Sequence, residues 1–246
     1  MQGSERYNRS GYLISFLTIV IFWKVLAILL GNPAIPSPER VLSAIYASRE
    51  ELAVNAVISL LRVTYSILLS FSIAFPLGIL SRENGVDKII SPFIYLLYPI
   101  PHIVLLPLYI LLFGIGDLAR VALIATILFF QIVVTTRDAA RQVSEYYVYS
   151  IRSLGASKFD IYRHVIIPAT MPKIITALRI SVGTAIAVLF FAESFATNSG
   201  LGYLIMDSWS RADYGKMYAA IVSMALLGFL LYMLLEAVER RVCRWI

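Results

Sequence analysis

The chain has few residues that could do chemistry, and the ionisable ones lie in or beside long apolar runs. Glu193 is the clearest case, because the run F-F-A-E-S-F-A-T-N-S-G holds it near the end of an apolar segment. An ionisable group in such a segment is expensive to keep in hydrocarbon and is therefore a functional candidate. Glu193 could line or gate a solute pathway, or it could accept structural hydrogen bonds from neighbouring Ser or Thr. If the solute were an anion, a paired or gating carboxylate would fit better than a solute-binding one.

Arg179 lies near the other end of the same segment. Its long stem can carry the guanidinium to the membrane surface, or the charge can form a positive site on the path of an anion. Small residues recur there at every fourth position, and this spacing permits either tight helix packing or a narrow pathway wall. The two rows are Ala177, Ser181, Ala185 and Gly183, Ala187. We take Ser181, Glu193 and Thr197 as candidate residues of a pathway or gate.

Nothing in the sequence indicates an enzyme. His102 and His164 are the only histidines, and neither belongs to a metal-binding spacing such as H-E-x-x-H. A membrane enzyme would need nucleophiles, acid–base pairs or metal ligands on facing spans, and the few polar residues of the apolar runs form no such set. There is also no G-x-x-x-x-G-K-[ST] phosphate loop. We therefore expect no bound metal or cofactor and an energy source, if one is used, on a partner.

The composition predicts an integral membrane protein. Hydrophobic residues make up 59% of the 246 residues and charged residues only 15%, whereas soluble domains have about 25% charged residues. The net charge of +6 is spread between apolar runs, so the expected partner is the lipid bilayer rather than a nucleic acid. Cys243 is the single cysteine, which rules out a disulfide within the chain.

Six apolar segments come close to the roughly 20 residues that a helix needs to cross a bilayer. The prediction is an all-α protein with six transmembrane helices in one domain, residues 1–246. The segments run roughly over Tyr12–Leu30, Val54–Leu80, Phe93–Phe113, Leu118–Val134, Ile174–Phe195 and Met217–Leu235.

Three features qualify this pattern. Lys24 lies inside the first run, and its cost of roughly 3 kcal/mol is offset by the many apolar neighbours. Arg62 predicts that the start of the second segment lies at the interface, with the guanidinium reaching the surface. Pro99, Pro101 and Pro107 predict that the third segment is bent.

Lysine and arginine predict the orientation, because they stay preferentially on the cytoplasmic side. With the N-terminus inside, the outer loops hold only Arg40, Arg49, Arg211 and Lys216, and Arg120 is ambiguous. Both termini are then cytoplasmic. The inner parts hold Arg6, Arg9, Arg82, Lys88, Arg137, Arg141, Arg152, Lys158, Arg163, Lys173, Arg240, Arg241 and Arg244.

The longest inner loop, residues 135–173, has the signals of two short helices. Ser144 can cap a first helix, and Gly155 can end it in the left-handed conformation. Ser157 and Asp160 have the spacing of a capping box for a second helix, which Pro168 is expected to stop. The pattern predicts a compact knob that fits a groove on a soluble partner.

The residues of this loop carry a family resemblance. S-I-R-S-L-G-A-S-K-F-D-I-Y-R-H-V-I-I-P resembles the loop of ABC importer permeases that reads E-A-A-x-x-x-G, nine further residues and I-x-L-P. Gly155 and Pro168 match its spacing, whereas Tyr149 stands where the family has glutamate and Ser150 and Ile151 replace the alanines. Further stretches in family order are P-S-P-E-R-V, P-I-P-H-I-V-L-L-P-L, L-F-G-I-G-D and S-G-L-G-Y-L-I. Together they are similar to the nitrate, sulfonate and taurine importer permeases.

The resemblance implies a type I ABC importer permease fold in the cell membrane with a cytoplasmic coupling helix. It implies a homodimer, or a pair with a close relative, joined to two ABC ATPase subunits that use ATP. It also implies an extracytoplasmic solute-binding protein, and a solute that is a nitrate-, sulfonate- or taurine-type anion or a vitamin precursor such as a thiamine pyrimidine or riboflavin. The residues it assigns to ATPase coupling are Tyr149, Arg152, Leu154, Gly155, Ala156, Ser157, Lys158 and Pro168.

Overall fold

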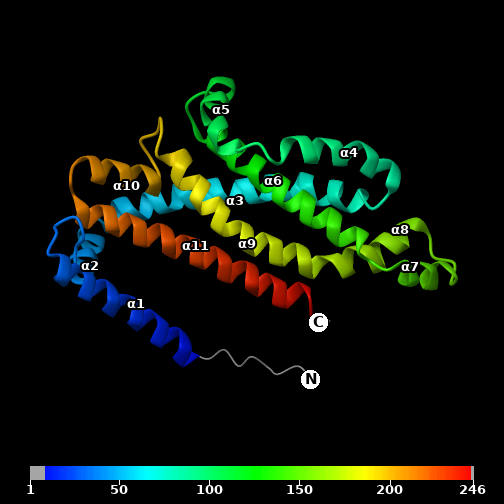
Figure 1. Ribbon diagram of the computed structural model, residues 1–246, viewed down its shortest axis with the longest axis horizontal. Helices are drawn as coiled ribbons and strands as arrows, with labels where there is room; N and C mark the ends of the chain where they lie inside the picture. The colour runs from blue at the N-terminus through cyan, green and yellow to red at the C-terminus, as the bar shows by residue number, and fades with distance from the viewer. Residues whose placement is uncertain (1–8, 245–246) are drawn as a thin grey trace.

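The computed structural model describes residues 9–244, and within that range the regular secondary structure is helical (Figure 1). The side chains of Arg6 and Arg9, two of the charges that predict the orientation, lie outside the described part. The longer helices are α1 (Arg9–Leu30), α3 (Arg49–Leu80), α6 (Asp117–Arg141), α9 (Ile167–Glu193) and α11 (Tyr214–Val242). The shorter elements are α2 (Pro38–Ala47), α4 (Asn84–Leu97), a 3₁₀ turn (His102–Leu105), α5 (Leu106–Phe113), α7 (Glu145–Arg152), α8 (Lys158–Ile161), a π-turn (Tyr162–Ile166) and α10 (Leu201–Ser210).

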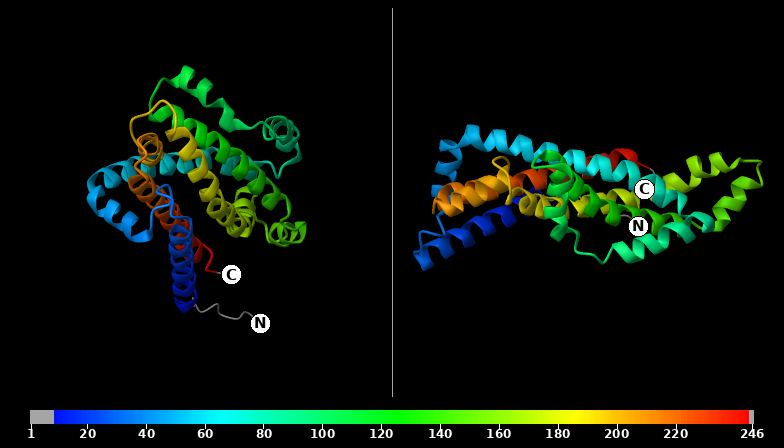
Figure 2. Two further views of the ribbon diagram at one scale, coloured as in Figure 1. Left: turned by 60° about the vertical axis from the view of Figure 1, so that its left-hand side comes forward. Right: turned by 90° about the horizontal axis from the view of Figure 1, so that it is seen from above.

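Helices α3, α6, α9 and α11 run along the long axis of the molecule and form its core. At one end, α7 and α8 project beyond the bundle; we call residues 144–161 the knob (Figure 2). At the opposite end, which we call the far end, residues 194–200 join α9 to α10. Helix α1 extends along one side of the bundle and makes few contacts with it.

Helix α3 packs closely against α6 in the core. A Cβ added at Gly78 of α3 would lie 2.5 Å from the Cβ of Thr136 on α6. The absence of a side chain at Gly78 therefore lets the two helices touch, as small residues do at interfaces between membrane helices. Large apolar side chains such as Phe22, Leu96 and Leu111 point outward instead. Such an apolar exterior suits a lipid environment.

Four helical stretches in the described part are long and apolar enough to cross a membrane: Arg49–Leu80, Asp117–Arg141, Lys158–Glu193 and Tyr214–Val242. Helix α4 and the segment His102–Phe113 form a pair bent by 80°, which raises the number to five if the pair is one span. The apolar part of α1, Ile14–Leu30, is shorter. The all-helical prediction and the bend of the third segment are confirmed, whereas the count of six spans is confirmed only for these four or five.

The prediction that Arg62 reaches the membrane surface is wrong. Helix α3 is one continuous helix from Arg49, and the Arg62 side chain is only 3% exposed inside the bundle. Acidic partners that follow much later in the chain, Asp117 and Glu193, draw it inward.

The prediction that Pro168 stops a helix is also wrong. The helical stretch continues from Lys158 to Glu193, because a π-turn precedes the proline. The N–H of Ile167 bonds to the carbonyl of Tyr162, five residues back, so the backbone is reset just before Pro168. Pro168 then occupies the first turn of α9, where a missing N–H is tolerated.

The close contact at Gly78 predicts a measurable cost of substitution. Gly78→Ala should lower the thermal unfolding midpoint in detergent, because the new methyl group forces α3 and α6 apart at a cost of about 1–3 kcal/mol. Gly85→Ala is the matched control, since a Cβ there meets nothing within 4 Å. An unchanged midpoint for Gly78→Ala would show that the helices separate freely.

Candidate functional site

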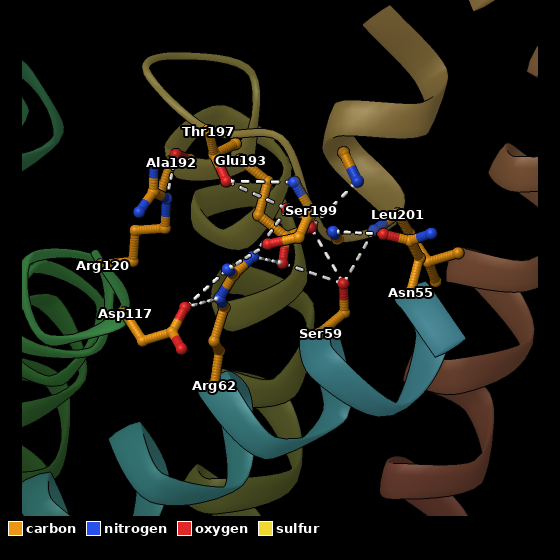
Figure 3. Close-up of polar contacts among 12 residues, drawn as sticks. Asn55, Ser59, Arg62, Asp117, Arg120, Ala192, Glu193, Thr197, Ser199 and Leu201 are labelled. Carbon is orange, nitrogen blue, oxygen red and sulfur yellow. Dashed lines mark hydrogen bonds and ion pairs between the residues drawn. The ribbon is translucent and has the colours of Figure 1, made fainter. Parts of the chain in front are cut away.

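A cluster of polar side chains occupies the far end of the bundle, where α3, α6, α9 and the 194–200 loop meet (Figure 3). We call it the far-end cluster. Its side chains are Asn55, Ser59, Arg62, Asp117, Arg120, Glu193 and Ser199.

Glu193 is the centre of this cluster and is fully buried. Arg62 Nη1 lies 2.7 Å from Glu193 Oε1, and the Ser59 hydroxyl donates to the same oxygen at 2.8 Å. The backbone N–H of Gly202 donates to Oε2 at 2.9 Å. Burying an ion costs several kcal/mol unless it is paired and its remaining lone pairs are satisfied. Here a cation, a hydroxyl and the first turn of α10 meet that requirement together.

Two glycines in S-G-L-G provide the space for the carboxylate. A Cβ at Gly200, which has φ +106°, would overlap the carboxyl group of Glu193. A Cβ at Gly202 would lie 2.6 Å from the Cβ of Glu193. The N–H of Gly200 donates to Asn55 Oδ1 at 2.6 Å, and that of Leu201 donates to Ser59 Oγ at 2.9 Å. The free N–H groups at the start of α10 are thus capped by α3 and by Glu193.

Arg62 joins three further groups. Its Nε donates to Asp117 Oδ1 at 2.8 Å at the start of α6. Nη1 also donates to the carbonyl of Ser199 at 2.9 Å, and Nη2 donates to the Ser199 hydroxyl at 3.0 Å. One guanidinium therefore fixes the start of α6, the end of α9 and the following loop relative to α3. This planar, multidentate geometry is typical of arginine rather than lysine.

Arg120 supports the same loop through backbone carbonyls. Its Nε donates to the carbonyl of Ala192 and one Nη donates to that of Phe195, both at 3.1 Å, and the same Nη also contacts the carbonyl of Ala196. These carbonyls lie at the C-terminal end of α9, where a cation is favourable to the helix dipole. The far-end cluster thus holds two cations, Arg62 and Arg120, and two anions, Asp117 and Glu193, and it is Arg62 that forms ion pairs with both anions.

The structure separates the three predicted pathway residues. Glu193 is in the far-end cluster, and Thr197 lies beside it, where its hydroxyl donates to the carbonyl of Ser199 at 3.2 Å. Ser181 lies elsewhere, in a groove between α6 and α9. The structural alternative for Glu193 assumed hydrogen bonds from neighbouring Ser or Thr, whereas its hydroxyl partner is Ser59 on α3.

The groove has a volume of about 580 Å³, within the range of roughly 300–1,000 Å³ that small-molecule sites occupy. Its polar lining consists of hydroxyl and amide groups, and Gln131 Nε2 lies 3.3 Å from Thr184 Oγ1. Among its lining residues in the described part of the chain, Lys173 is the only charged one. The lining residues are Tyr98, Gln131, Val134, Thr135, Pro172, Lys173, Thr176, Ala177, Ile180, Ser181 and Thr184.

Arg179, a further cation within an apolar helix, is also paired within the protein. Arg179 Nη1 lies 3.1 Å from Glu239 Oε2 on α11, and its guanidinium lies over the ring of Tyr232. The sequence left open whether Arg179 reaches the surface or forms a positive site for an anion. The ion pair with Glu239 neutralises the charge and disfavours the second alternative.

The knob forms by the predicted local signals. The Ser144 side chain accepts the N–H of Tyr146, Gly155 has φ +86°, and Ser157 and Asp160 form a capping box. Val148 and Ile161 are buried and anchor the knob on the bundle.

The knob presents Tyr149 and Leu154 on its outer surface, with 61% and 86% exposure. Arg152, Gly155, Ser157 and Lys158 are also exposed, whereas Ala156 is half-buried. Pro168 lies outside the knob, in α9.

The far-end cluster was missed by the sequence analysis except for Glu193, although one signal for it exists. Asn55, Ser59, Arg62 and Ser66 follow one another at spacings of four, three and four residues, which puts them on one face of a helix. A polar stripe on an otherwise apolar helix indicates buried polar contacts. Its partners on α6 and α9 could not be read from spacing.

Apolar helices long enough to span a membrane define an integral membrane protein, with a groove between α6 and α9 and an exposed helical knob. The comparisons identify its family. The profile of the family described as binding-protein-dependent transport system inner membrane component matches residues 66–244. The chain belongs to this family, whose members are permeases of ABC importers and not enzymes.

Three relatives show how the similarity is distributed. An ABC transporter permease protein of Methanocaldococcus jannaschii is 33% identical, over 92% of this chain and 88% of the relative. The taurine transport system permease protein of Escherichia coli is 28% identical, over 92% and 86%. The formylaminopyrimidine transport permease protein of Halalkalibacterium halodurans is 28% identical, over 94% and 93%.

The fold is similar to that of a solved importer. An inward-facing structure of the MetNI methionine ABC transporter contains a chain that matches with a TM-score of 0.66 and 19% identity, over 80% of this chain and 98% of that chain. This likeness supports the permease fold.

Because Arg62 neutralises the buried charge of Glu193, removing Arg62 should strongly lower the stability of the protein. Arg62→Met should lower stability by about 3 kcal/mol or more, because it leaves a buried carboxylate without its cation. The double variant Arg62→Met with Glu193→Met should recover much of that loss, as measured by thermal unfolding in detergent. Arg211→Met is the control, since Arg211 is 70% exposed in its pair with Asp207. Simple additivity of the two single effects would contradict the pairing.

Proposed function

We propose that this chain is the permease subunit that moves a small anionic solute, of the nitrate, sulfonate or taurine type, by alternating access. In this proposal two copies of the chain bind two ABC ATPase subunits and receive the solute from an extracytoplasmic binding protein. The observation that carries the proposal is the groove between α6 and α9, which is partly lined by hydroxyl and amide groups, on a chain whose family is the membrane component of such importers.

The groove lining supports an anion. The Thr184 hydroxyl can donate to a solute, whereas those of Thr135 and Thr176 already donate to Gln131 and Glu239. Lys173 supplies a positive charge, and no lining residue is acidic in the described part. A sulfonate or nitrate needs several donors and little counter-charge to leave again. The similarity to the taurine transport system permease protein of Escherichia coli supports such a solute.

The exposed face beside the groove supports a second copy of the chain. Ile180 is 71% exposed, and Gly183 and Ala187 on the same helix are also exposed. A Cβ at Gly183 would meet nothing within 4 Å, so this glycine is not required by packing within the chain. A helix of a second copy against this row would close the open side of the groove and complete the pathway.

Two features support the predicted topology of six spans with both termini in the cytoplasm. Lys24 forms an ion pair with Glu39 of α2 at 2.6 Å, which reduces the cost of a lysine within α1 and favours α1 as a span. The knob then lies in the cytoplasm, where ATPase subunits bind. Its exposed Tyr149 and Leu154, with Arg152 and Lys158, offer an apolar centre with cationic neighbours.

Glu193 and Thr197 belong, in this proposal, to an extracytoplasmic gate. The far-end cluster fixes the 194–200 loop to α3 and α6, so a change in the angle between these helices must displace the loop. Ser181 belongs to the pathway itself.

One alternative solute class has support from the comparisons. The formylaminopyrimidine permease of Halalkalibacterium halodurans is as similar to this chain as the taurine permease is. A heterocyclic vitamin precursor could use the same neutral donors without Lys173. Uptake into proteoliposomes with the cognate ATPase and binding protein would distinguish the two solute classes. Inhibition of uptake by excess sulfonate supports the anionic solute, whereas inhibition only by a pyrimidine overturns the proposal of an anion.

The knob predicts a specific defect. Gly155→Val should reduce recovery of the ATPase with the affinity-purified permease by roughly tenfold. A valine in the left-handed conformation of Gly155 costs about 1–2 kcal/mol, so the turn shifts and the knob no longer fits the ATPase. The side chain itself has room, since a Cβ at Gly155 meets nothing within 4 Å.

Gly31→Val is the matched control for this prediction. Gly31 also has a left-handed φ, +55°, and open space around its Cβ, but it lies in the turn between α1 and α2. Full ATPase recovery with Gly155→Val would show that the knob is not the docking element.

The groove predicts a transport defect without an assembly defect. Thr184→Leu should lower solute uptake by roughly tenfold, the factor that a loss of 1.4 kcal/mol gives, because it fills the groove and removes a hydroxyl. ATPase recovery should persist. Ser223→Leu is the control, since it fills a separate apolar groove between α3 and α11. Normal uptake by Thr184→Leu would place the pathway elsewhere.

A further inference from the structure

The short turn between α3 and α4 makes polar contacts with both ends of the knob and with the segments that join it to α6 and α9. On the α6 side, Arg82 Nη1 donates to the carbonyls of Ala140 and Val143 at 2.7 and 3.0 Å. Arg82 Nη2 forms an ion pair with Glu145 in the first turn of α7. Arg82 therefore fixes the point where α6 ends and the knob begins.

Glu83, the next residue, contacts the other end of the knob and the π-turn that follows it. Glu83 Oε1 accepts the hydroxyl of Tyr162 at 2.8 Å and lies 3.2 Å from Lys158 Nζ. Tyr162 begins the π-turn through which the knob continues into α9. The Tyr162 hydroxyl, followed by Lys158, lowers the pKa of Glu83 below its ordinary value. The carboxylate is therefore ionised at neutral pH and remains a strong acceptor.

Further contacts tie the same turn to α6. Arg141 donates to the carbonyl of Ser81 at 3.3 Å, and Arg137 and Arg141 both pair with Asp87 at the start of α4. Beneath these polar contacts, Ile79 of α3 packs in one apolar cluster with residues of the knob, among them Val148. The turn is thus held to the knob by polar contacts on two sides and by an apolar layer.

Helix α3 connects this turn with the far-end cluster. It is assigned as one helix of 32 residues, which passes through Pro76, and its length is about 48 Å. Arg82 and Glu83 follow its C-terminal end, whereas Ser59 and Arg62 on its N-terminal half hold Glu193. A displacement of the knob that tilts α3 must therefore change the contacts of Arg62 with α6 and α9.

We infer that Arg82 and Glu83 form a latch that carries movement of the knob into α3, and that these two are positioning residues for coupling ATP hydrolysis to transport. The inference rests on the proposed function, because it takes the knob as the ATPase docking element. Arg82 and Glu83 contact the places where the knob joins the bundle. Tyr149 and Leu154, by contrast, are exposed on the outer surface of the knob. Docking and coupling are thus assigned to different side chains.

The test measures solute uptake and ATP hydrolysis in the same proteoliposomes, which contain the permease, its ATPase and the loaded binding protein. Glu83→Ala and Tyr162→Phe each remove the hydrogen bond. Each should lower the uptake per ATP hydrolysed by roughly fivefold, a change of about 1 kcal/mol in coupling. The double variant should be no worse than Glu83→Ala alone, because Glu83→Ala has already removed the bond that Tyr162→Phe removes.

Two further variants separate the hydrogen bond from other effects. Glu83→Gln keeps a carbonyl that can accept the Tyr162 hydroxyl, so it should retain more of the uptake per ATP than Glu83→Ala. Glu50→Ala removes a carboxylate from the other end of α3, where the side chain is 91% exposed, and should leave uptake per ATP unchanged.

The outcomes distinguish the latch from the proposed function. If the unaltered permease does not retain the ATPase, the proposed function fails and the latch with it. If the unaltered complex couples normally and Glu83→Ala and Tyr162→Phe do too, the latch alone is overturned. A fall in complex recovery with unchanged uptake per ATP also overturns it, since the residues would then serve folding only.

Discussion

The buried carboxylate of Glu193 sets the constraint on which the arrangement of the far end depends. A charge in an apolar bundle must have a cation and hydrogen-bond donors in contact, or it costs several kcal/mol. Arg62 supplies the cation, and Ser59 and the N–H of Gly202 supply the donors. Arg62 and Ser59 belong to α3, and Gly202 belongs to α10, which follows the 194–200 loop. Satisfying one carboxylate therefore fixes α3, α9 and α10 relative to one another. The glycines at 200 and 202 follow from the same requirement for space.

Helix α3 extends this constraint to the other end of the molecule. Its N-terminal half holds the far-end cluster, its C-terminal half packs against α6 at Gly78, and the turn after it contacts the knob. In the proposed function the permease must respond at its solute gate to an event at its ATPase, and we propose that this one long helix connects the two ends. The groove is lined by residues of α6 and α9, and α6 packs against α3. In the proposed mechanism, a tilt of α3 that shifts α6 would therefore alter the shape of the groove. Such two-position packing of helices is a common basis for switching between states.

Local structure was predictable from the sequence, and contacts between distant segments were not. The turn at Gly155 and the capping box at Ser157 depend on residues within a few positions, so their types and spacing were sufficient. The bend of the third segment followed from its prolines. By contrast, Arg62 and Glu193 lie 131 residues apart, and nothing near either one identifies the other. Pro168 was misread because its effect depends on the π-turn before it, which has no simple sequence signature.

Coupling of this chain to a cytoplasmic ATPase requires that the knob face the cytoplasm, and cysteine labelling measures which side of the membrane it faces. Leu154 is 86% exposed at the outer surface of the knob, so a cysteine there is accessible to a reagent on the same side. The experiment uses Leu154→Cys combined with Cys243→Ser, because Cys243 is the chain's only cysteine. A membrane-impermeant maleimide should leave the cysteine unmodified in intact cells and modify it in inside-out vesicles. Modification in intact cells would place the knob outside and would contradict the coupling of this chain to a cytoplasmic ATPase.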